Sequence, residues 1–326
     1  MKQKIIIFIS VLTLSLSVTA QVKNEPKRVS GKVMANGITI AYEIFGAENN
    51  EAILLICGTG SQLTDWPVEL CEKLARKGYR VIRFDNRDVG LSSRFDSLGA
   101  PNWSAVLPKI KTCDTSALQY TVQDMARDAV GLLDALKIEK AHIAGASMGG
   151  AIAQMIAINF PERTLSLTSI AASSGDPNLP AGDPKVLAVM AAPPPVTDNI
   201  DERGKYLFNI YKALDSEVYP TPDSVLMRIA MSNVKRSWYP EGAARQAAAI
   251  IIADNCDRRE ELKNIHVPVV IIHGDADPVV NVEAAREINM VIKDSKLIII
   301  PGMGHALSPQ LIDKIVNGIL TATKSK

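Results

Sequence analysis

The chain has 326 residues, of which 47% are hydrophobic and 22% charged, and this composition is typical of a folded domain with one large core. Its 36 lysine and arginine residues nearly balance its 35 acidic residues, so the net charge of +1 does not suggest a nucleic acid or an anionic membrane as a partner. The same composition excludes disordered and fibrous classes, and a small neutral molecule is the partner that fits best.

The first twenty residues have the pattern of a cleaved secretory signal. Lys2 and Lys4 precede an apolar run over residues 5–18, and small residues up to Ala20 stand where signal peptidase cuts. An apolar run of roughly fourteen residues is shorter than the roughly twenty that span a bilayer, so we expect cleavage rather than a stable membrane anchor. The mature chain then comprises residues 21–326 and is secreted or periplasmic.

Four cysteines, Cys57, Cys71, Cys113 and Cys256, enter an oxidising compartment if this signal is used. An even number allows up to two disulfides, but the sequence does not choose among the three ways of pairing all four. Their spacing does not resemble a zinc site, and we predict neither a metal ion nor a cofactor.

Strand-like and helical patterns alternate along most of the mature chain. Two alternating runs, 32–35 and 38–42, flank the dipeptide Asn36-Gly37 and predict a β-hairpin. Further strand-like runs lie at 52–56, 80–84, 140–146, 165–170, 267–272 and 297–300, and helical patterns at 65–76, 120–136, 148–159 and 308–319. This order predicts an α/β fold with a mostly parallel sheet of eight strands, flanked by helices.

The alternation stops between residue 173 and about residue 260. Prolines are frequent in the first part of this stretch, and helical patterns without clear strands follow. A plain loop of this length is rare in a compact domain. We therefore predict an inserted helical lid, mobile and selective for substrate, over the carboxyl edge of the sheet, where open parallel sheets bind their ligands.

A Gly-x-Ser-x-Gly motif at residues 145–149 joins the last residues of a strand-like run to the helical pattern 148–159. A serine on so sharp a turn adopts strained backbone angles, and the flanking glycines let the strand and the helix pass closely. Ser147 then projects its hydroxyl at the edge of the sheet, and the helix N-terminus faces any negative charge that develops there. The motif also arises by chance, but its place between a strand and a helix favours a nucleophile for acyl transfer.

A serine hydroxyl needs a histidine to take its proton, and the chain has four histidines. Three of them, His142, His266 and His273, lie within or beside predicted strands, and we expect structural roles for them. His305 lies in a glycine-rich loop after the last strand, at the same edge of the sheet as Ser147. We predict that His305 is the general base.

A carboxylate must orient that histidine, and the stretch 273–278, His-Gly-Asp-Ala-Asp-Pro, offers two. Both follow an apolar strand, and either could instead cap a turn or a helix. We choose Asp277, because the chain order Ser, Asp, His is expected for a hydrolase built on such a sheet. Asp275 is the alternative, and Asp176, after an earlier strand, is a third option.

Two backbone N–H groups must stabilise the oxyanion of the tetrahedral intermediate. The Met148 N–H, at the start of the helix, is the first candidate. The second comes from the glycine-rich loop 58–61 that follows an apolar strand, and we choose Thr59. Phosphate binding by this loop is not favoured, because no Gly-Lys-Ser/Thr follows it.

Several motifs together resemble the α/β-hydrolase superfamily over roughly residues 31–320. They are Cys-Gly-Thr-Gly at 57–60, Phe-Asp-Asn-Arg-Asp-Val-Gly-Leu-Ser at 84–92, Gly-Ala-Ser-Met-Gly-Gly at 145–150, His-Gly-Asp-Ala-Asp-Pro at 273–278 and Gly-Met-Gly-His at 302–305. Within the superfamily the chain looks most like esterases resembling aclacinomycin methylesterase, which implies carboxylic-ester hydrolysis without a cofactor. Ser147, Asp277 and His305 match the family's triad, whereas Cys57 stands where many relatives carry histidine or proline.

The predicted function is hydrolysis of a small, fairly hydrophobic carboxylic ester through a Ser-His-Asp triad and an acyl-enzyme. The fold hosts many reactions, so other serine chemistries stay open: lactone opening, carbon–carbon cleavage, removal of terminal peptide residues and perhydrolysis. A hydrolase-like ligand-binding protein is an alternative of a different class. The sequence does not indicate an oligomeric state.

Overall fold

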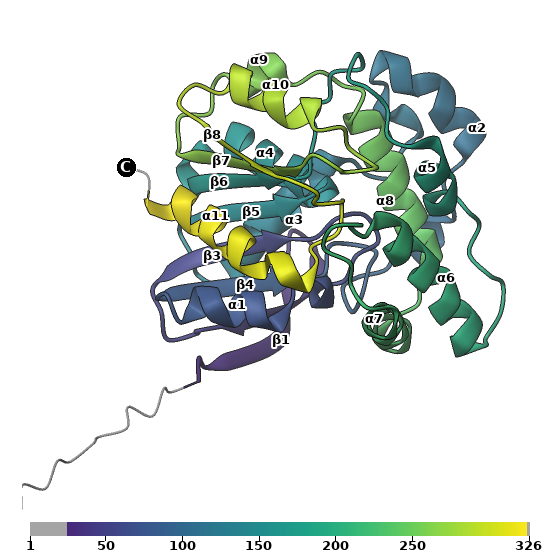
Figure 1. The fold of residues 1–326 in the computed structure, drawn as a ribbon, viewed down its shortest axis with the longest axis horizontal. Coiled ribbons are helices and arrows are strands. Elements are labelled where there is room, and N and C mark those ends of the chain that lie inside the picture. Colours follow the sequence, from purple (N-terminus) through teal and green to yellow (C-terminus); the bar gives the residue numbers. More distant parts are fainter. Residues whose placement is uncertain (1–24, 325–326) are drawn as a thin grey trace, which may run out of the picture.

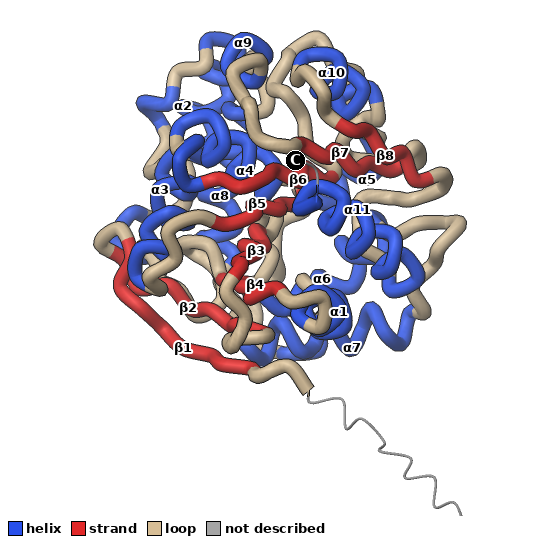
Figure 2. The backbone as a smooth tube through the Cα atoms, turned by 90° about the vertical axis from the view of Figure 1, so that its left-hand side faces the viewer, coloured by secondary structure: helices blue, strands red, loops and turns tan. Residues whose placement is uncertain are grey.

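A computed structural model describes residues 25–324, so the predicted signal at residues 1–20 lies outside the described residues. Eight strands form one sheet in the order β1-β2-β4-β3-β5-β6-β7-β8 (Figure 2). They are β1 Arg28–Ala35, β2 Ile38–Phe45, β3 Glu51–Ile56, β4 Tyr79–Phe84, β5 Ala141–Ala146, β6 Thr164–Ile170, β7 Val269–Gly274 and β8 Lys296–Ile300. The predicted α/β fold with an eight-stranded sheet is confirmed.

The sheet is antiparallel at its first edge and parallel beyond it. β1 and β2 pair as a hairpin around Asn36 and Gly37, whose φ angles of 48° and 78° suit the turn that Asn-Gly favours. β2 pairs antiparallel with β4, and the neighbouring pairs from β4 to β8 are parallel. Parallel strands end at one edge of a sheet, so Ser147, Asp277 and His305, which follow β5, β7 and β8, share that edge.

Helices cover both faces of the sheet. On one face, α3 Val122–Ala135, α4 Met148–Asn159 and α10 Glu283–Val291 contribute buried side chains to one core. On the other face, α1 Val68–Ala75 and α11 Ile312–Lys324 bury side chains in a second core. Strands covered on both sides are apolar at successive positions, which explains the continuous apolar runs in the sequence.

The end of the chain differs from its predicted boundaries. A short 3-10 turn, η6 Pro309–Leu311, precedes α11, so the helix begins and ends several residues later than predicted. Two other short turns, η1 Leu63–Asp65 and η5 Pro161–Arg163, lie in connections between strands and helices. Among residues 25–324, no helix has both the length and the apolar composition needed to cross a membrane.

The stretch predicted as an inserted lid is helical in the structure. Its helices are α5 Pro184–Met190, α6 Ile200–Leu214, α7 Asp223–Arg236, α8 Pro240–Ala253 and α9 Arg259–Leu262. Figure 1 shows α5 to α8 grouped to the right of the sheet, whereas α9 lies beside α10. We refer to α5, α6, α7 and α8 as the lid helices.

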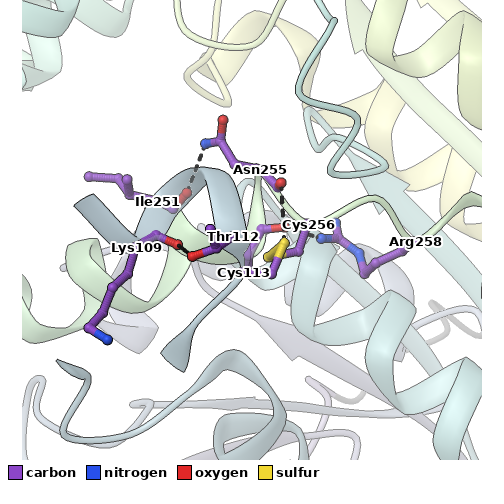
Figure 3. Close-up of a disulfide and its surroundings, with 8 residues drawn as sticks. Lys109, Thr112, Cys113, Ile251, Asn255, Cys256 and Arg258 are labelled. Atoms are coloured by element: carbon purple, nitrogen blue, oxygen red, sulfur yellow. Dashed lines mark hydrogen bonds between the residues drawn. A yellow bond between two sulfur atoms is a disulfide. The ribbon is translucent and has the colours of Figure 1, made fainter. Parts of the chain in front are cut away.

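Short helices also occupy the connection between β4 and α3, and a disulfide joins it to the end of α8. The helices are η2 Asp96–Leu98, α2 Trp103–Val106, η3 Leu107–Thr112 and η4 Thr115–Ala117. Cys113, just after η3, is bonded to Cys256, and their Cα atoms lie 5.5 Å apart (Figure 3). Cys57 and Cys71 are free and buried. The structure thus selects one pairing where the sequence left the choice open.

Candidate active site

The Gly-x-Ser-x-Gly motif forms a sharp turn between β5 and α4. Ser147 has a φ of 56° and a ψ of −125°, a conformation that is strained for a residue with a Cβ. Strand and helix approach so closely that a Cβ on Gly145 would lie 2.0 Å from the Gly149 carbonyl oxygen. The Ser147 N–H donates to the Ile170 carbonyl at 2.9 Å, which ties the turn to β6.

Ser147, His305 and Asp277 form one hydrogen-bonded chain. His305 Nε2 lies 3.0 Å from Ser147 Oγ, and His305 Nδ1 lies 2.8 and 3.0 Å from the two carboxylate oxygens of Asp277. Because a carboxylate only accepts, this geometry assigns the proton to Nδ1 and leaves Nε2 free to accept the serine proton. The side chains of His305 and Asp277 are 7% and 0% exposed, so their contact is shielded from water.

The surroundings of Asp277 favour its ionised form. Burial by itself raises the pKa of this carboxyl, but interactions with His305 and His273 outweigh burial and hold the pKa well below its usual range. The N–H groups of Val279 and Val280 also donate to Asp277 Oδ1, at 2.8 and 3.0 Å. A carboxylate held in this way can stabilise an imidazolium when His305 takes up a proton.

His273 is a second histidine beside the same carboxylate. Its Nε2 lies 2.8 Å from the Val280 carbonyl oxygen and 3.4 Å from Asp277 Oδ2, and its side chain is fully buried. His273 therefore holds the loop that carries Asp277, in agreement with the structural role expected for it.

The alternative residues considered from the sequence have other partners. Asp275 accepts the Gly302 N–H at 2.6 Å, so it fastens the turn after β8. Asp176 pairs with Arg259 at 2.7 Å. Within β5, the ring nitrogens of His142 lie 2.8 Å from side-chain oxygens of two neighbouring strands.

The segments that carry the two candidate N–H donors adjoin the nucleophile. Met148 is the first residue of α4, where backbone N–H groups have no partner within the helix. Gly58 packs against Ser147, since a Cβ on Gly58 would lie 3.2 Å from the Ser147 Cβ and 3.7 Å from its Oγ. Thr59 follows in a tight turn, closed by the Ser61 N–H donating to the Gly58 carbonyl at 3.3 Å.

The end of lid helix α6 holds the loop that carries His305. The Leu214 carbonyl accepts the N–H groups of both His305 and Ala306, each at 3.0 Å. Gly304 passes so close that a Cβ there would lie 2.8 Å from the Asp215 carbonyl oxygen. Sequence patterns give no signal for these contacts, because they join backbone groups of segments that are distant in the chain.

A partly buried carboxyl that was not predicted as a site residue also lies in this region. Asp254, directly after α8, accepts a hydrogen bond from Ser173 Oγ at 2.9 Å. Burial raises the pKa of Asp254, while interactions with Arg258, Ser173 and His305 act in the opposite direction. In the sequence, an aspartate after a helix is ordinary, so no pattern could have marked it.

The arrangement can support nucleophilic attack on a carbonyl carbon, because it combines a serine at the edge of the sheet with a base, an orienting carboxylate and candidate N–H donors. Across residues 25–324, no three His, Cys, Asp or Glu side chains are grouped as a metal ion would require.

A model of the alpha/beta hydrolase fold family matches residues 51–310. The chain belongs to the α/β-hydrolase fold family. The matched range begins at β3, ends within η6 and includes Ser147, Asp277 and His305. The resemblance inferred from the motifs is thus confirmed for this α/β hydrolase.

Relatives with assigned activities align over most of the chain. Rhodomycin D methylesterase DnrP of Streptomyces peucetius is 26% identical over 306 residues, covering 88% of this α/β hydrolase and 96% of the relative. The 2-hydroxy-6-oxo-2,4-heptadienoate hydrolase of Pseudomonas putida is 23% identical, covering 86% of this chain and 91% of its own.

Solved structures confirm the fold. A meta-cleavage product hydrolase from Pseudomonas fluorescens IP01 superposes with a TM-score of 0.69 at 21% identity, covering 89% of this chain and 96% of its own. The enol-lactonase from Burkholderia xenovorans LB400 superposes with a TM-score of 0.69 at 20% identity, covering 90% of this chain and 100% of its own. At this level of identity the likeness speaks for the fold alone.

Proposed function

We propose that this α/β hydrolase is a serine esterase that cleaves a small, fairly hydrophobic carboxylic ester through an acyl-enzyme. The observation that carries the proposal is the continuous hydrogen-bonded chain from Asp277 through His305 to Ser147, which ends on a serine in a strained turn at a helix N-terminus.

The proposed reaction has two halves. Ser147 Oγ attacks the ester carbonyl carbon while its proton passes to His305 Nε2, and the N–H groups of Met148 and Thr59 stabilise the resulting oxyanion. The intermediate collapses, the carbon–oxygen bond to the alcohol breaks, and the alcohol leaves with the proton from His305. Water then attacks the acyl-enzyme in the same way, giving the acid and free Ser147. Asp277 stabilises the imidazolium in both halves.

The relatives support ester hydrolysis as the first choice among serine chemistries. The named methylesterase aligns over nearly its whole length, and a methylesterase acts on a carboxylic ester. The enol-lactonase and the meta-cleavage product hydrolase share the fold, and one fold can host several reactions.

Hydrolysis of 4-nitrophenyl butyrate by the purified mature chain tests this proposal. Ser147→Ala should lower kcat by at least about a thousandfold, because it removes the nucleophile. Ser169→Ala is the control for loss of a serine hydroxyl, since Ser169 is buried within β6 and bonds to Gln154. An inactive wild-type chain, or a Ser147→Ala variant as active as the control, would contradict the proposal.

We further propose that the lid helices select the substrate. Leu214 holds the loop of His305, Gln246 contacts the glycine-rich loop 58–61, and the Asp183 N–H donates to the Pro278 carbonyl beside Asp277. An exchange for a relative's lid should therefore be confined to residues 184–205. Such an exchange should change the ranking of a panel of esters while 4-nitrophenyl acetate is still cleaved. An unchanged ranking would place specificity outside the exchanged segment.

We also propose that the chain is exported after cleavage near Ala20. The intact mass of the protein from its native host tests this proposal, and a mass that retains Met1 would contradict export.

A further inference from the structure

The peptide unit that carries the Thr59 N–H is held on both sides. On one side, the Cys57 carbonyl accepts the amide of Asn86 Nδ2 at 3.1 Å. On the other side, the Gly60 N–H donates to Gln246 Oε1 at 2.8 Å. Because each peptide unit is planar, fixing both neighbours leaves the unit between Gly58 and Thr59 little freedom to rotate.

Gln246 uses both ends of its amide and is fully buried. Its Nε2 donates to the Arg87 carbonyl at 2.6 Å, while its Oε1 accepts from Gly60. The same helix touches the loop a second time, since a Cβ on Gly60 would lie 3.2 Å from the Ala243 Cβ. Helix α8 therefore packs directly on the glycine-rich loop 58–61, which we call the oxyanion loop.

The conformation of Gly60 shows what this contact selects. Gly60 has a φ of +68°, and it stands third in the turn closed between Gly58 and Ser61. A positive φ at that position is the mark of a type II turn. A type II turn differs from a type I turn by a flip of its central peptide, which here joins Thr59 and Gly60. The flipped peptide would turn the Gly60 N–H away from Gln246 and leave a buried amide oxygen without a partner, which costs free energy.

Helix α8 is itself fixed to the core at the neighbouring residue. Arg245 donates from Nε and Nη2 to the two carboxylate oxygens of Asp88, at 2.7 and 2.9 Å, and both side chains are buried. A bidentate pair of this kind restricts both position and orientation. This ion pair therefore ties the turn of α8 that carries Gln246 to the segment after β4.

We infer that Gln246 is a positioning residue for the oxyanion loop, acting through Gly60 to hold the Thr59 N–H toward the reacting carbonyl. The inference rests on the proposed ester hydrolysis and adds a component supplied by the inserted helices. Loss of the Gln246 amide should weaken stabilisation of the oxyanion and leave the nucleophile and base in place.

The test compares an ester with the matching thionoester, in which sulfur replaces the carbonyl oxygen. Sulfur is larger and a weaker hydrogen-bond acceptor, so thionoester cleavage gains less from the oxyanion donors. Gln246→Met, which keeps a side chain of similar size, should lower kcat for the ester about tenfold with KM changed less than about twofold. The ratio of ester to thionoester kcat should fall by a similar factor.

Gln154→Met is the matched control. Gln154 is a fully buried glutamine on α4, but its amide contacts Ser169 and Arg258 instead of the oxyanion loop. The control should keep the wild-type ratio of ester to thionoester kcat. Thermal unfolding checks that each variant is folded, and Gln246→Asn, one methylene shorter, replaces Gln246→Met if that variant is not.

The outcomes separate the two proposals. A wild-type chain that hydrolyses no ester contradicts the proposed function. An active wild-type chain whose Gln246 variant keeps the wild-type ratio, or whose ratio falls no more than that of Gln154→Met, overturns the positioning role and leaves the proposed function standing.

Discussion

Asp275 and Asp277 stand two residues apart in one loop, yet their carboxylates have different tasks in the structure. Asp277 contacts His305 Nδ1, whereas Asp275 accepts the Gly302 N–H. Asp277→Asn should lower kcat about 10⁴-fold, because the amide favours the histidine tautomer that cannot accept the serine proton. Steady-state kinetics on a 4-nitrophenyl ester measures the loss, with Asp275→Asn as the control. A larger loss in the control would reverse the assignment of the two residues.

The sequence could predict some site residues better than others. Ser147 is marked by a local motif and His305 by its loop after the last strand, and both lie where they were expected. Spacing alone could not separate Asp275 from Asp277, and the choice needed the chain order of the family. Gln246 and Leu214 carried no signal, because their roles depend on contacts between distant segments that only the fold brings together.

At the scale of elements, helix α7 is anchored to the core by a partly buried carboxyl next to the oxyanion loop. Asn233 Nδ2 donates to Asp65 Oδ1 at 2.7 Å and to the Tyr211 hydroxyl at 2.8 Å. Burial raises the pKa of Asp65 to about 6, although its bonds with Asn233 and Gln62 act in the opposite direction.

This shift predicts how stability depends on pH. An acid with a raised pKa is least costly to bury when protonated, so its contribution is fully present below pH 4 and is lost as pH rises through about 6. Relative to the wild type, Asp65→Asn should therefore gain about 2–3 kcal/mol in free energy of unfolding between pH 4 and pH 8. Urea unfolding at several pH values measures the difference, and a difference that stays flat with pH would contradict the raised pKa of Asp65.

Local patterns predicted the elements that alternate regularly and were less informative elsewhere. α4 has the predicted bounds, because the Ser147 turn fixes its start. α11 begins later than expected, since Pro309 opens a separate 3-10 turn before it. α10 and the short helices between β4 and α3 were not predicted, because they are brief and their stability comes from packing rather than from a long periodic pattern.

At the scale of the whole molecule, the Cys113–Cys256 disulfide joins two excursions from the sheet, one after β4 and one at the end of α8. Closing so long a loop restricts the unfolded chain, so reduction should lower the free energy of unfolding by about 2–4 kcal/mol and lower the Tm. Thermal unfolding with and without dithiothreitol measures the effect. The Cys113→Ser/Cys256→Ser variant is the control, and an equal response of wild type and control to dithiothreitol would contradict a stabilising disulfide.

The central claim is that Ser147, activated by His305 and Asp277, is the covalent nucleophile of a serine hydrolase. Labelling the purified chain with a fluorophosphonate and mapping the modified peptide by mass spectrometry tests it most directly. We predict one adduct, on Ser147, formed rapidly by the wild type, slowly by Asp277→Asn and not at all by Ser147→Ala. An adduct on another residue, or labelling that persists in Ser147→Ala, would contradict the claim.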